Sequence, residues 1–257
     1  MKKIFFETKD KLKLCGILEE PKTKTDKCVI LAHGITVDKD EDGVFILLSN
    51  QLCKLGFAVF RFDFSAHGES KGQPIDMTIT REVNDLEAAV KEIEKQYSKI
   101  ALLGASFGGS ISTFYVANNQ EKINCLCLWN PVLNYDHTFI NPTLPWIKER
   151  KAHMFKEIQE KGWTTLGSKK FIYGKALFDE MIKLKPFESL EKINIPTEII
   201  HGDKDTKVPY EDSLKYSQKL TNGKLITIKN AEHGFHESWE SKIAIEETIN
   251  FLSNYFK

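Results

Sequence analysis

Residues 104–108 read Gly-Ala-Ser-Phe-Gly, which matches the pattern Gly-x-Ser-x-Gly. Residues 100–103 before them are apolar, as in a short buried strand, whereas Ile111, Phe114 and Tyr115 after them recur at helical spacing. A sharp strand-to-helix turn of this kind projects its central serine clear of the sheet, and glycines suit both flanks because they tolerate unusual backbone angles. The pattern predicts a tight turn carrying Ser106. For the pentapeptide alone, a glycine-rich turn with an incidental serine is the alternative.

Strand and helix patterns alternate along most of the chain. Two alternating runs at 4–8 and 12–18 predict an antiparallel hairpin at a sheet edge. Further apolar runs, separated by helical patterns, occur at 28–32, 57–60, 100–103, 123–129, 197–200 and 224–228. Repeated units of this kind predict an α/β fold with a mainly parallel sheet, helices on both faces and functional loops at the carboxyl ends of the strands. At 257 residues, the chain 1–257 suits one domain.

Residues 134–185 interrupt this alternation. Prolines and glycines divide the segment into short helical pieces, and it is unusually rich in aromatic residues. An insertion this long in a compact domain is typically functional, so we expect a cap over the strand ends; the alternative is a helical excursion whose aromatic residues pack only on one another. Candidate substrate-binding residues are the aromatic residues Trp129, Phe139, Trp146, Trp163 and Tyr173.

Charge and cysteine content restrict the partners. Thirty-six basic residues balance thirty-six acidic ones, so no global field favours nucleic acid or an anionic membrane, and a neutral small molecule is the expected substrate. The cysteines are five in number, and Cys125 and Cys127 alternate along a predicted strand with no neighbouring histidine or cysteine at metal-ligand spacing. This indicates reduced thiols and points to the cytoplasm. No signal peptide or transmembrane stretch is expected. A homodimer is one assembly that the sequence allows.

A serine hydroxyl needs a base, usually a histidine oriented by a carboxylate. Of the seven histidines, His233 and His236 follow the last predicted strand, from which an imidazole can reach the Ser106 turn; His233 is nearer the strand end and is preferred. Asp203 and Asp205 follow the preceding strand. Asp205 is displaced toward the neighbouring loop, whereas Asp203 suits hydrogen bonds within its own turn, but these arguments separate the two carboxylates poorly.

Backbone amides must stabilise the oxyanion that forms when a serine attacks a carbonyl. Phe107, which follows the serine, supplies one amide at the start of a helix. Ile35, after His33 and Gly34 at the end of an early strand, is the candidate for the second; as an alternative, this segment is only a strand-ending turn.

Metal and cofactor binding have weaker support. Asp63, His67 and Glu69 could form a metal site, but their spacing suits a hydrogen-bonded loop. No phosphate-binding or dinucleotide fingerprint appears. We therefore expect no metal and no cofactor.

Five motifs in order along the chain resemble the landmarks of the α/β-hydrolase superfamily: 32–34 (Ala-His-Gly), 61–70 (Arg-Phe-Asp-Phe-Ser-Ala-His-Gly-Glu-Ser), 104–109 (Gly-Ala-Ser-Phe-Gly-Gly), 201–205 (His-Gly-Asp-Lys-Asp) and 232–233 (Glu-His). The layout is similar to small cytosolic carboxylesterases, especially cinnamoyl and feruloyl esterases, and more distantly to monoacylglycerol lipases and serine-aminopeptidase-like proteins. The resemblance implies an α/β-hydrolase fold and makes Asp205 the triad acid. Ala105 departs from it, because many of these relatives place a histidine there.

The sequence therefore predicts a serine carboxylesterase that hydrolyses esters of small aryl or acyl carboxylic acids through Ser106, His233 and Asp205. The same triad could serve a peptidase or amidase, a thioesterase, a lipase or an acyltransferase, because the leaving-group preference lies in the pocket. A hydrolase-fold binding protein without turnover is the alternative from another class.

Overall fold

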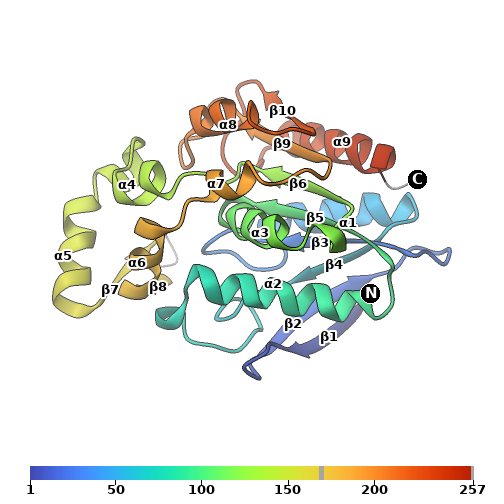
Figure 1. The fold of residues 1–257 in the computed structure, drawn as a ribbon, viewed down its shortest axis with the longest axis horizontal. Helices are drawn as coiled ribbons and strands as arrows, with labels where there is room; N and C mark the ends of the chain where they lie inside the picture. Colours follow the sequence, from blue (N-terminus) through green and yellow to red (C-terminus); the bar gives the residue numbers. More distant parts are fainter. Residues whose placement is uncertain (168–170, 256–257) are drawn as a thin grey trace.

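An eight-stranded sheet forms the centre of the molecule (Figure 1). The structure is a computed structural model, and it describes residues 1–167 and 171–255. The strand order is β1-β2-β4-β3-β5-β6-β9-β10, and only β2 runs against its neighbours. The strands are β1 (Lys2–Glu7), β2 (Lys13–Glu19), β3 (Lys27–Ala32), β4 (Ala58–Phe62), β5 (Lys99–Ala105), β6 (Cys125–Trp129), β9 (Thr197–Gly202) and β10 (Gly223–Ile228). The predicted edge hairpin and the mainly parallel sheet are confirmed.

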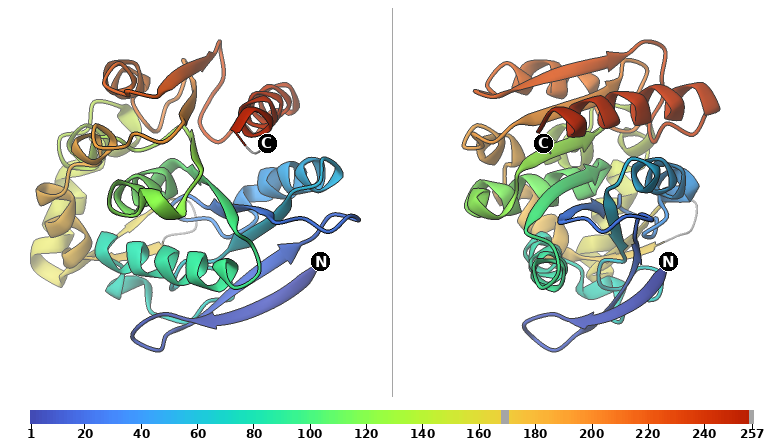
Figure 2. Two further views of the ribbon diagram at one scale, coloured as in Figure 1. Left: turned by 45° about the vertical axis from the view of Figure 1, so that its right-hand side comes forward. Right: turned by 90° about the vertical axis from the view of Figure 1, so that its right-hand side faces the viewer.

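Helices cover both faces of this sheet, and the two views of Figure 2 show them on opposite sides. One face carries α1 (Val44–Lys54) and α9 (Ser238–Tyr255). The other carries α2 (Ile79–Glu94), α3 (Ser106–Asn118), α7 (Pro186–Leu190) and α8 (Tyr210–Ser217). Three single-turn 3₁₀ helices complete the described connections: η1 (Glu41–Gly43), η2 (Pro74–Asp76) and η3 (Gln120–Lys122). None of the helices described in residues 1–167 and 171–255 is both long and apolar enough to cross a bilayer.

The continuous apolar runs in the sequence follow from this layering. In β3, Cys28 and Ile30 face the core beneath α2 and α3, whereas Val29 and Leu31 face the core beneath α1 and α9. Successive side chains of a strand point to opposite faces, so a strand that is buried on both sides must be apolar throughout. This packing fixes the positions of the loops at the strand ends.

Most of the described residues between 134 and 185 lie to the left of the sheet in Figure 1. Their described elements are η4 (Asp136–Ile140, one π turn), α4 (Pro145–Lys148), α5 (Lys151–Lys161), β7 (Trp163–Leu166), β8 (Phe171–Gly174) and α6 (Lys175–Lys183). The antiparallel pair β7–β8 is a feature that the sequence patterns did not predict. Glu180 on α6 accepts hydrogen bonds from the amide and hydroxyl of Thr80 at 2.9 and 2.8 Å, which ties the segment to the start of α2.

The helix α3 approaches β3 closely at Gly108, where a Cβ atom would lie 2.3 Å from the His33 carbonyl oxygen and 2.4 Å from that of Ala32. Backbone atoms cannot move aside as a flexible side chain can. Gly108→Ala is therefore expected to lower the free energy of unfolding by about 3 kcal/mol or more, at the upper end of overpacking penalties. Chemical denaturation measures this loss. The control is Gly162→Ala, where no atom lies within 4 Å but φ is +79°, and only the roughly 1–2 kcal/mol for a left-handed residue is expected. A smaller loss for Gly108→Ala than for the control would contradict the packing argument.

Candidate active site

Ser106 stands at the turn between β5 and α3, as the sequence predicts for this segment. Its φ of +51° is in the left-handed region, which non-glycine residues rarely adopt and which is common where a side chain must be held for function. The turn is fixed from the other side because the Val132 amide donates to the Ser106 carbonyl oxygen at 3.0 Å. The hydroxyl is thus presented at the carboxyl edge of the sheet.

The structure brings Ser106, His233 and Asp205 together although they are far apart in the sequence. The Ser106 hydroxyl lies 3.0 Å from Nε2 of His233, and Nδ1 of the same ring lies 2.6 Å from Oδ2 of Asp205. An ionised carboxylate only accepts hydrogen bonds, so Nδ1 carries the ring proton and Nε2 is left to accept from the serine hydroxyl. This is the arrangement in which an imidazole can take the proton of a serine.

Asp205 accepts more hydrogen bonds than the one from His233. Its Oδ1 accepts from the amides of Lys207 and Val208, both at 2.8 Å, and its Oδ2 accepts from Nε2 of His201 at 3.1 Å. Burial by itself disfavours the ionised form, but the charge of His233 and the hydrogen bonds from His201 and His233 hold the pKa of Asp205 well below its usual value. Asp205 is therefore ionised at neutral pH.

His201 contacts Asp205, and the sequence analysis did not assign it a role in the site. Its Nδ1 lies 2.7 Å from the Ser213 hydroxyl, which can donate to it, so that Nε2–H faces Asp205. Its position four residues before Asp205, at the end of β9, was the available signal. His201 has the geometry to orient the carboxylate that orients His233.

The alternative residues lie elsewhere. His236 is exposed at the rim of the site, and Asp203 accepts from the amide of Asn230 at 2.6 Å. That amide belongs to the loop after β10, which lies beside the loop after β9 that carries Asp203. The contact is therefore not within the turn of Asp203 itself. Burial lowers the pKa of His233, but the negative charge of Asp205 and the hydrogen bond with it outweigh this effect, and the net pKa shift is upward.

The loop after β3 lies beside Ser106, where the sequence placed a second oxyanion amide. Phe64 donates its amide proton to Nε2 of His33 at 3.0 Å, and Nδ1 of His33 lies 2.7 Å from the Gly34 carbonyl oxygen. Burial lowers the pKa of His33 to about 4, so the ring is neutral and Nδ1–H donates. The Gly34–Ile35 peptide is held in this way from behind, which fixes the direction of the Ile35 amide. The Phe107 amide lies in the first turn of α3.

Glu41 is a second residue that the sequence analysis missed. Its carboxylate accepts from the Gly34 amide at 2.7 Å, and the side chain is buried beside Ser106 and His233. Burial raises the pKa of Glu41 to about 7, against the opposing effects of the Gly34 amide and His233. Only an acidic residue in the loop after His33 and Gly34 marked it in the sequence, and three neighbouring residues are acidic too.

A cavity of about 370 Å³ opens above Ser106. Residues from the strand ends and from the 134–185 segment line it together. Phe139 and Trp146, two of the five aromatic residues predicted to bind substrate, are among them. The indole of Trp146 donates to the Lys207 carbonyl oxygen at 2.6 Å, which attaches the segment to the loop that carries Asp205. The apolar side chains on the wall are Ile35, Val37, Val132, Phe139, Trp146, Leu166 and Val208.

The other three predicted substrate-binding residues do not line this cavity. Trp129 is buried between the sheet and α9, where its indole donates to the Thr248 hydroxyl at 2.9 Å. Tyr173 is fully buried in β8 and stacks on Phe171, and Trp163 begins β7 with the ammonium group of Lys161 over its ring. Trp129 and Tyr173 pack within the fold, Trp163 is half-buried, and none of the three lines the cavity above Ser106, so their assignment to substrate binding there is corrected.

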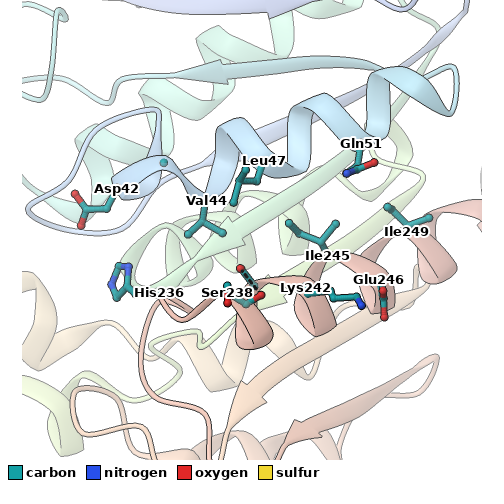
Figure 3. Close-up of a pocket in the computed structure, with 12 residues that line it drawn as sticks. Asp42, Val44, Leu47, Gln51, His236, Ser238, Lys242, Ile245, Glu246 and Ile249 are labelled. Carbon is teal, nitrogen blue, oxygen red and sulfur yellow. Dashed lines mark hydrogen bonds between the residues drawn. The ribbon is translucent and has the colours of Figure 1, made fainter.

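A larger groove of about 750 Å³ lies between α1 and α9 (Figure 3). Leu47 on α1 and Ile245 on α9 face each other across it, while Asp42 and His236 lie at one end and also border the cavity above Ser106. The groove contains none of the Ser106, His233 and Asp205 side chains. The larger of these two cavities is therefore not the one that contains Ser106 and His233.

The structure does not favour a metal site at Asp63, His67 and Glu69, because a lysine ammonium group lies beside its carboxylates. Donor atoms of Cys15, Asp63 and Glu69 lie within 4.8 Å of one another, but the ammonium group of Lys39 is 2.9 Å from Asp63 and 3.2 Å from Glu69. His67 is not part of this cluster, and its Nδ1 lies 3.0 Å from the Ser65 carbonyl oxygen. A buried lysine thus supplies the positive charge at this place.

Comparisons with known proteins identify the family and the fold. Residues 23–172, more than half of the chain, match the family described as "Serine aminopeptidase, S33" (Hydrolase_4). The structure of Est1E from Butyrivibrio proteoclasticus with bound ferulic acid superposes with a TM-score of 0.81 at 22% identity, over 97% of this chain and 99% of that one.

Two curated relatives are similar in sequence. The mitochondrial palmitoyl-protein thioesterase ABHD10 of Homo sapiens is 23% identical over 82% of this chain and 70% of its own length. The acylamino-acid-releasing enzyme of Mus musculus is 23% identical over 80% of this chain, but the match spans only 28% of that enzyme. The chain has the α/β-hydrolase fold and belongs to the serine aminopeptidase S33 family.

Proposed function

We propose that this protein is a carboxylesterase that cleaves small-molecule esters of aryl or short acyl acids with Ser106 as nucleophile. The observation that carries the proposal is the unbroken chain of hydrogen bonds from Ser106 through His233 to Asp205 at the floor of a largely apolar cavity. Fold alone does not assign chemistry. A connected nucleophile, base and orienting acid does support acyl transfer.

In the proposed cycle, Ser106 attacks the ester carbonyl while Nε2 of His233 takes its proton. Asp205 keeps the ring in the correct tautomer and stabilises the imidazolium. The amides of Ile35 and Phe107 stabilise the oxyanion. His233 then protonates the leaving alcohol, and a water molecule that it activates hydrolyses the acyl-enzyme.

The cavity supports the choice of acyl group. Its volume of about 370 Å³ is near the lower end of the range of roughly 300–1,000 Å³ for small-molecule sites. Phe139 and Trp146 offer flat apolar surfaces that suit an aromatic ring. Est1E, which superposes on almost the whole chain, binds ferulic acid. These observations favour a phenolic or short acyl acid over a long acyl chain.

Rates for a substrate panel test this proposal. We expect kcat/KM for methyl ferulate and p-nitrophenyl butyrate to exceed that for p-nitrophenyl palmitate by at least roughly tenfold, the discrimination that pocket fit typically gives. Aminoacyl p-nitroanilides and an acyl-coenzyme A measure amidase and thioesterase activity in parallel. A highest kcat/KM on an amide or a thioester would replace the ester assignment, and preference for the palmitate ester would overturn the assigned acyl class.

A further inference from the structure

The loop that carries Glu41 has an unusual backbone. Glu41, Asp42 and Gly43 all have positive φ values, of +45°, +50° and +96°. Two successive non-glycine residues in this region carry an energetic penalty and persist only where the surrounding structure imposes the conformation. Hydrogen bonds from Glu41 N to the Asp38 carbonyl oxygen and from Gly43 N to that of Asp40, at 2.9 and 2.8 Å, close the loop.

Two ion pairs hold this loop from below. Lys39 is buried and donates both its amide, at 2.8 Å, and its ammonium group, at 2.9 Å, to Asp63. The next residue, Asp40, accepts from Nε of the buried Arg61 at 2.8 Å. Residues 39 and 40 are therefore anchored in the sheet, and Glu41 is directed toward the active site.

The Glu41 carboxylate lies between the loop after β3 and the nucleophile. Its Oε2 accepts from the Gly34 amide at 2.7 Å. A Cβ atom on Gly34 would lie 3.2 Å from Oε1 of Glu41 and 3.2 Å from Cβ of Ser106, so the three groups are packed around one point. Glu41 also lines a small cavity of about 10 Å³ together with Ser106 and His233.

We propose that Glu41 is a positioning residue that holds Gly34 so that the Ile35 amide points at the developing oxyanion. This inference rests on the proposed function, because it concerns the same acyl-transfer site. His33 holds the carbonyl side of the Gly34–Ile35 peptide and Glu41 holds the amide of the preceding peptide. Glycine at position 34 has wide conformational freedom, so both contacts are needed to keep it in one orientation.

A carboxylate beside an oxyanion site would be expected to oppose the negative charge that develops there. Burial counters this problem, because it raises the pKa of Glu41 to about 7 and a large share of the molecules carry a neutral carboxyl group near neutral pH. Either form of the group has an oxygen that can accept from the Gly34 amide. The contact is therefore retained while the unfavourable charge is reduced.

Kinetics of Glu41 variants test the inference. Glu41→Ala removes the acceptor and is expected to lower kcat for ester hydrolysis by roughly 10- to 100-fold with little change in KM, less than the 100- to 1,000-fold typical for loss of a direct oxyanion donor. Glu41→Gln retains an acceptor oxygen and should keep most of the wild-type kcat. Affinity for a trifluoromethyl ketone, which mimics the tetrahedral intermediate, should fall in parallel with kcat in Glu41→Ala, whereas product-acid affinity should not.

Two further variants complete the design. Glu82→Gln changes another buried acid, on α2 and outside the cavity, and should leave kcat unchanged. Glu41→Asp withdraws the carboxylate by one methylene and is expected to lose kcat in the same direction as Glu41→Ala, so it tests the contact if the alanine variant does not fold. Thermal unfolding identifies variants that are folded.

The outcomes separate the two proposals. Wild-type kcat in folded Glu41→Ala or Glu41→Asp, or a kcat for Glu41→Gln as low as that of Glu41→Ala, would overturn the positioning role and leave the esterase assignment intact if Ser106→Ala is inactive. If the wild-type protein hydrolyses none of the panel and a fluorophosphonate does not label Ser106, the proposed function itself fails, and the role of Glu41 fails with it.

Discussion

Ser106→Ala is expected to lower kcat for ester hydrolysis by roughly a million-fold, the scale found when a triad nucleophile is removed. The hydroxyl lies 3.0 Å from Nε2 of His233, and the variant leaves the base without a nucleophile to activate. What remains should be the slow reaction of water in a site that still has its oxyanion amides. Initial rates with p-nitrophenyl butyrate, supported by loss of fluorophosphonate labelling, measure the effect.

Ser49→Ala provides a matched control for this change. Ser49 is a fully buried serine on α1, and its hydroxyl has no hydrogen-bond partner within the described part of the chain. Its removal should leave kcat unchanged. Hydrolysis by Ser106→Ala at the wild-type rate would show that the ester is cleaved elsewhere and would reject Ser106 as the nucleophile.

Local patterns were sufficient to predict most of the fold. The apolar run at 28–32 became β3 because its alternate side chains fill two separate cores. The turn at Ser106 was readable because close packing and a left-handed φ leave few residue types at its positions. Loop order along a parallel sheet then indicated which histidine could reach the serine, and His233 lies where this argument placed it.

Contacts between distant segments were not readable in the same way. Glu41 is one of several acidic residues in its loop, and only the anchors at Asp63 and Arg61 reveal which of them turns inward. Trp129 ends a strand at the correct edge, yet its indole donates to Thr248 on α9, and the residue does not line the cavity of about 370 Å³. A strand pattern gives alternation but does not say which face the alternation begins on, because that depends on the register with neighbouring strands.

The choice between the two carboxylates after β9 also depended on contacts between distant segments. Asp203 and Asp205 are two residues apart in one loop, and the spacing of the sequence separated them poorly. In the structure, Asp205 accepts from both His201 and His233, whereas Asp203 accepts from the Asn230 amide. The difference arises from how the loops after β9 and β10 lie beside each other, which is a tertiary property.

Asp205→Asn is expected to lower kcat by roughly 10,000-fold, as when the acid of a serine-protease triad becomes an amide. The amide nitrogen cannot accept from Nδ1 of His233, so the ring is driven toward the tautomer that carries its proton on Nε2 and cannot accept from Ser106.

The pH dependence of kcat/KM on the acid side, here called the acid limb, is a second measurement that tests the role of Asp205. Activity requires neutral His233, and Asp205 contributes to the upward shift of the pKa of His233. The rate of the wild type therefore falls as pH decreases through that raised pKa, and removing the charge of Asp205 should move this limb to lower pH. Asp203→Asn is the matched control, expected to keep both the rate and the limb in place. A larger loss in Asp203→Asn than in Asp205→Asn would exchange the roles of the two carboxylates.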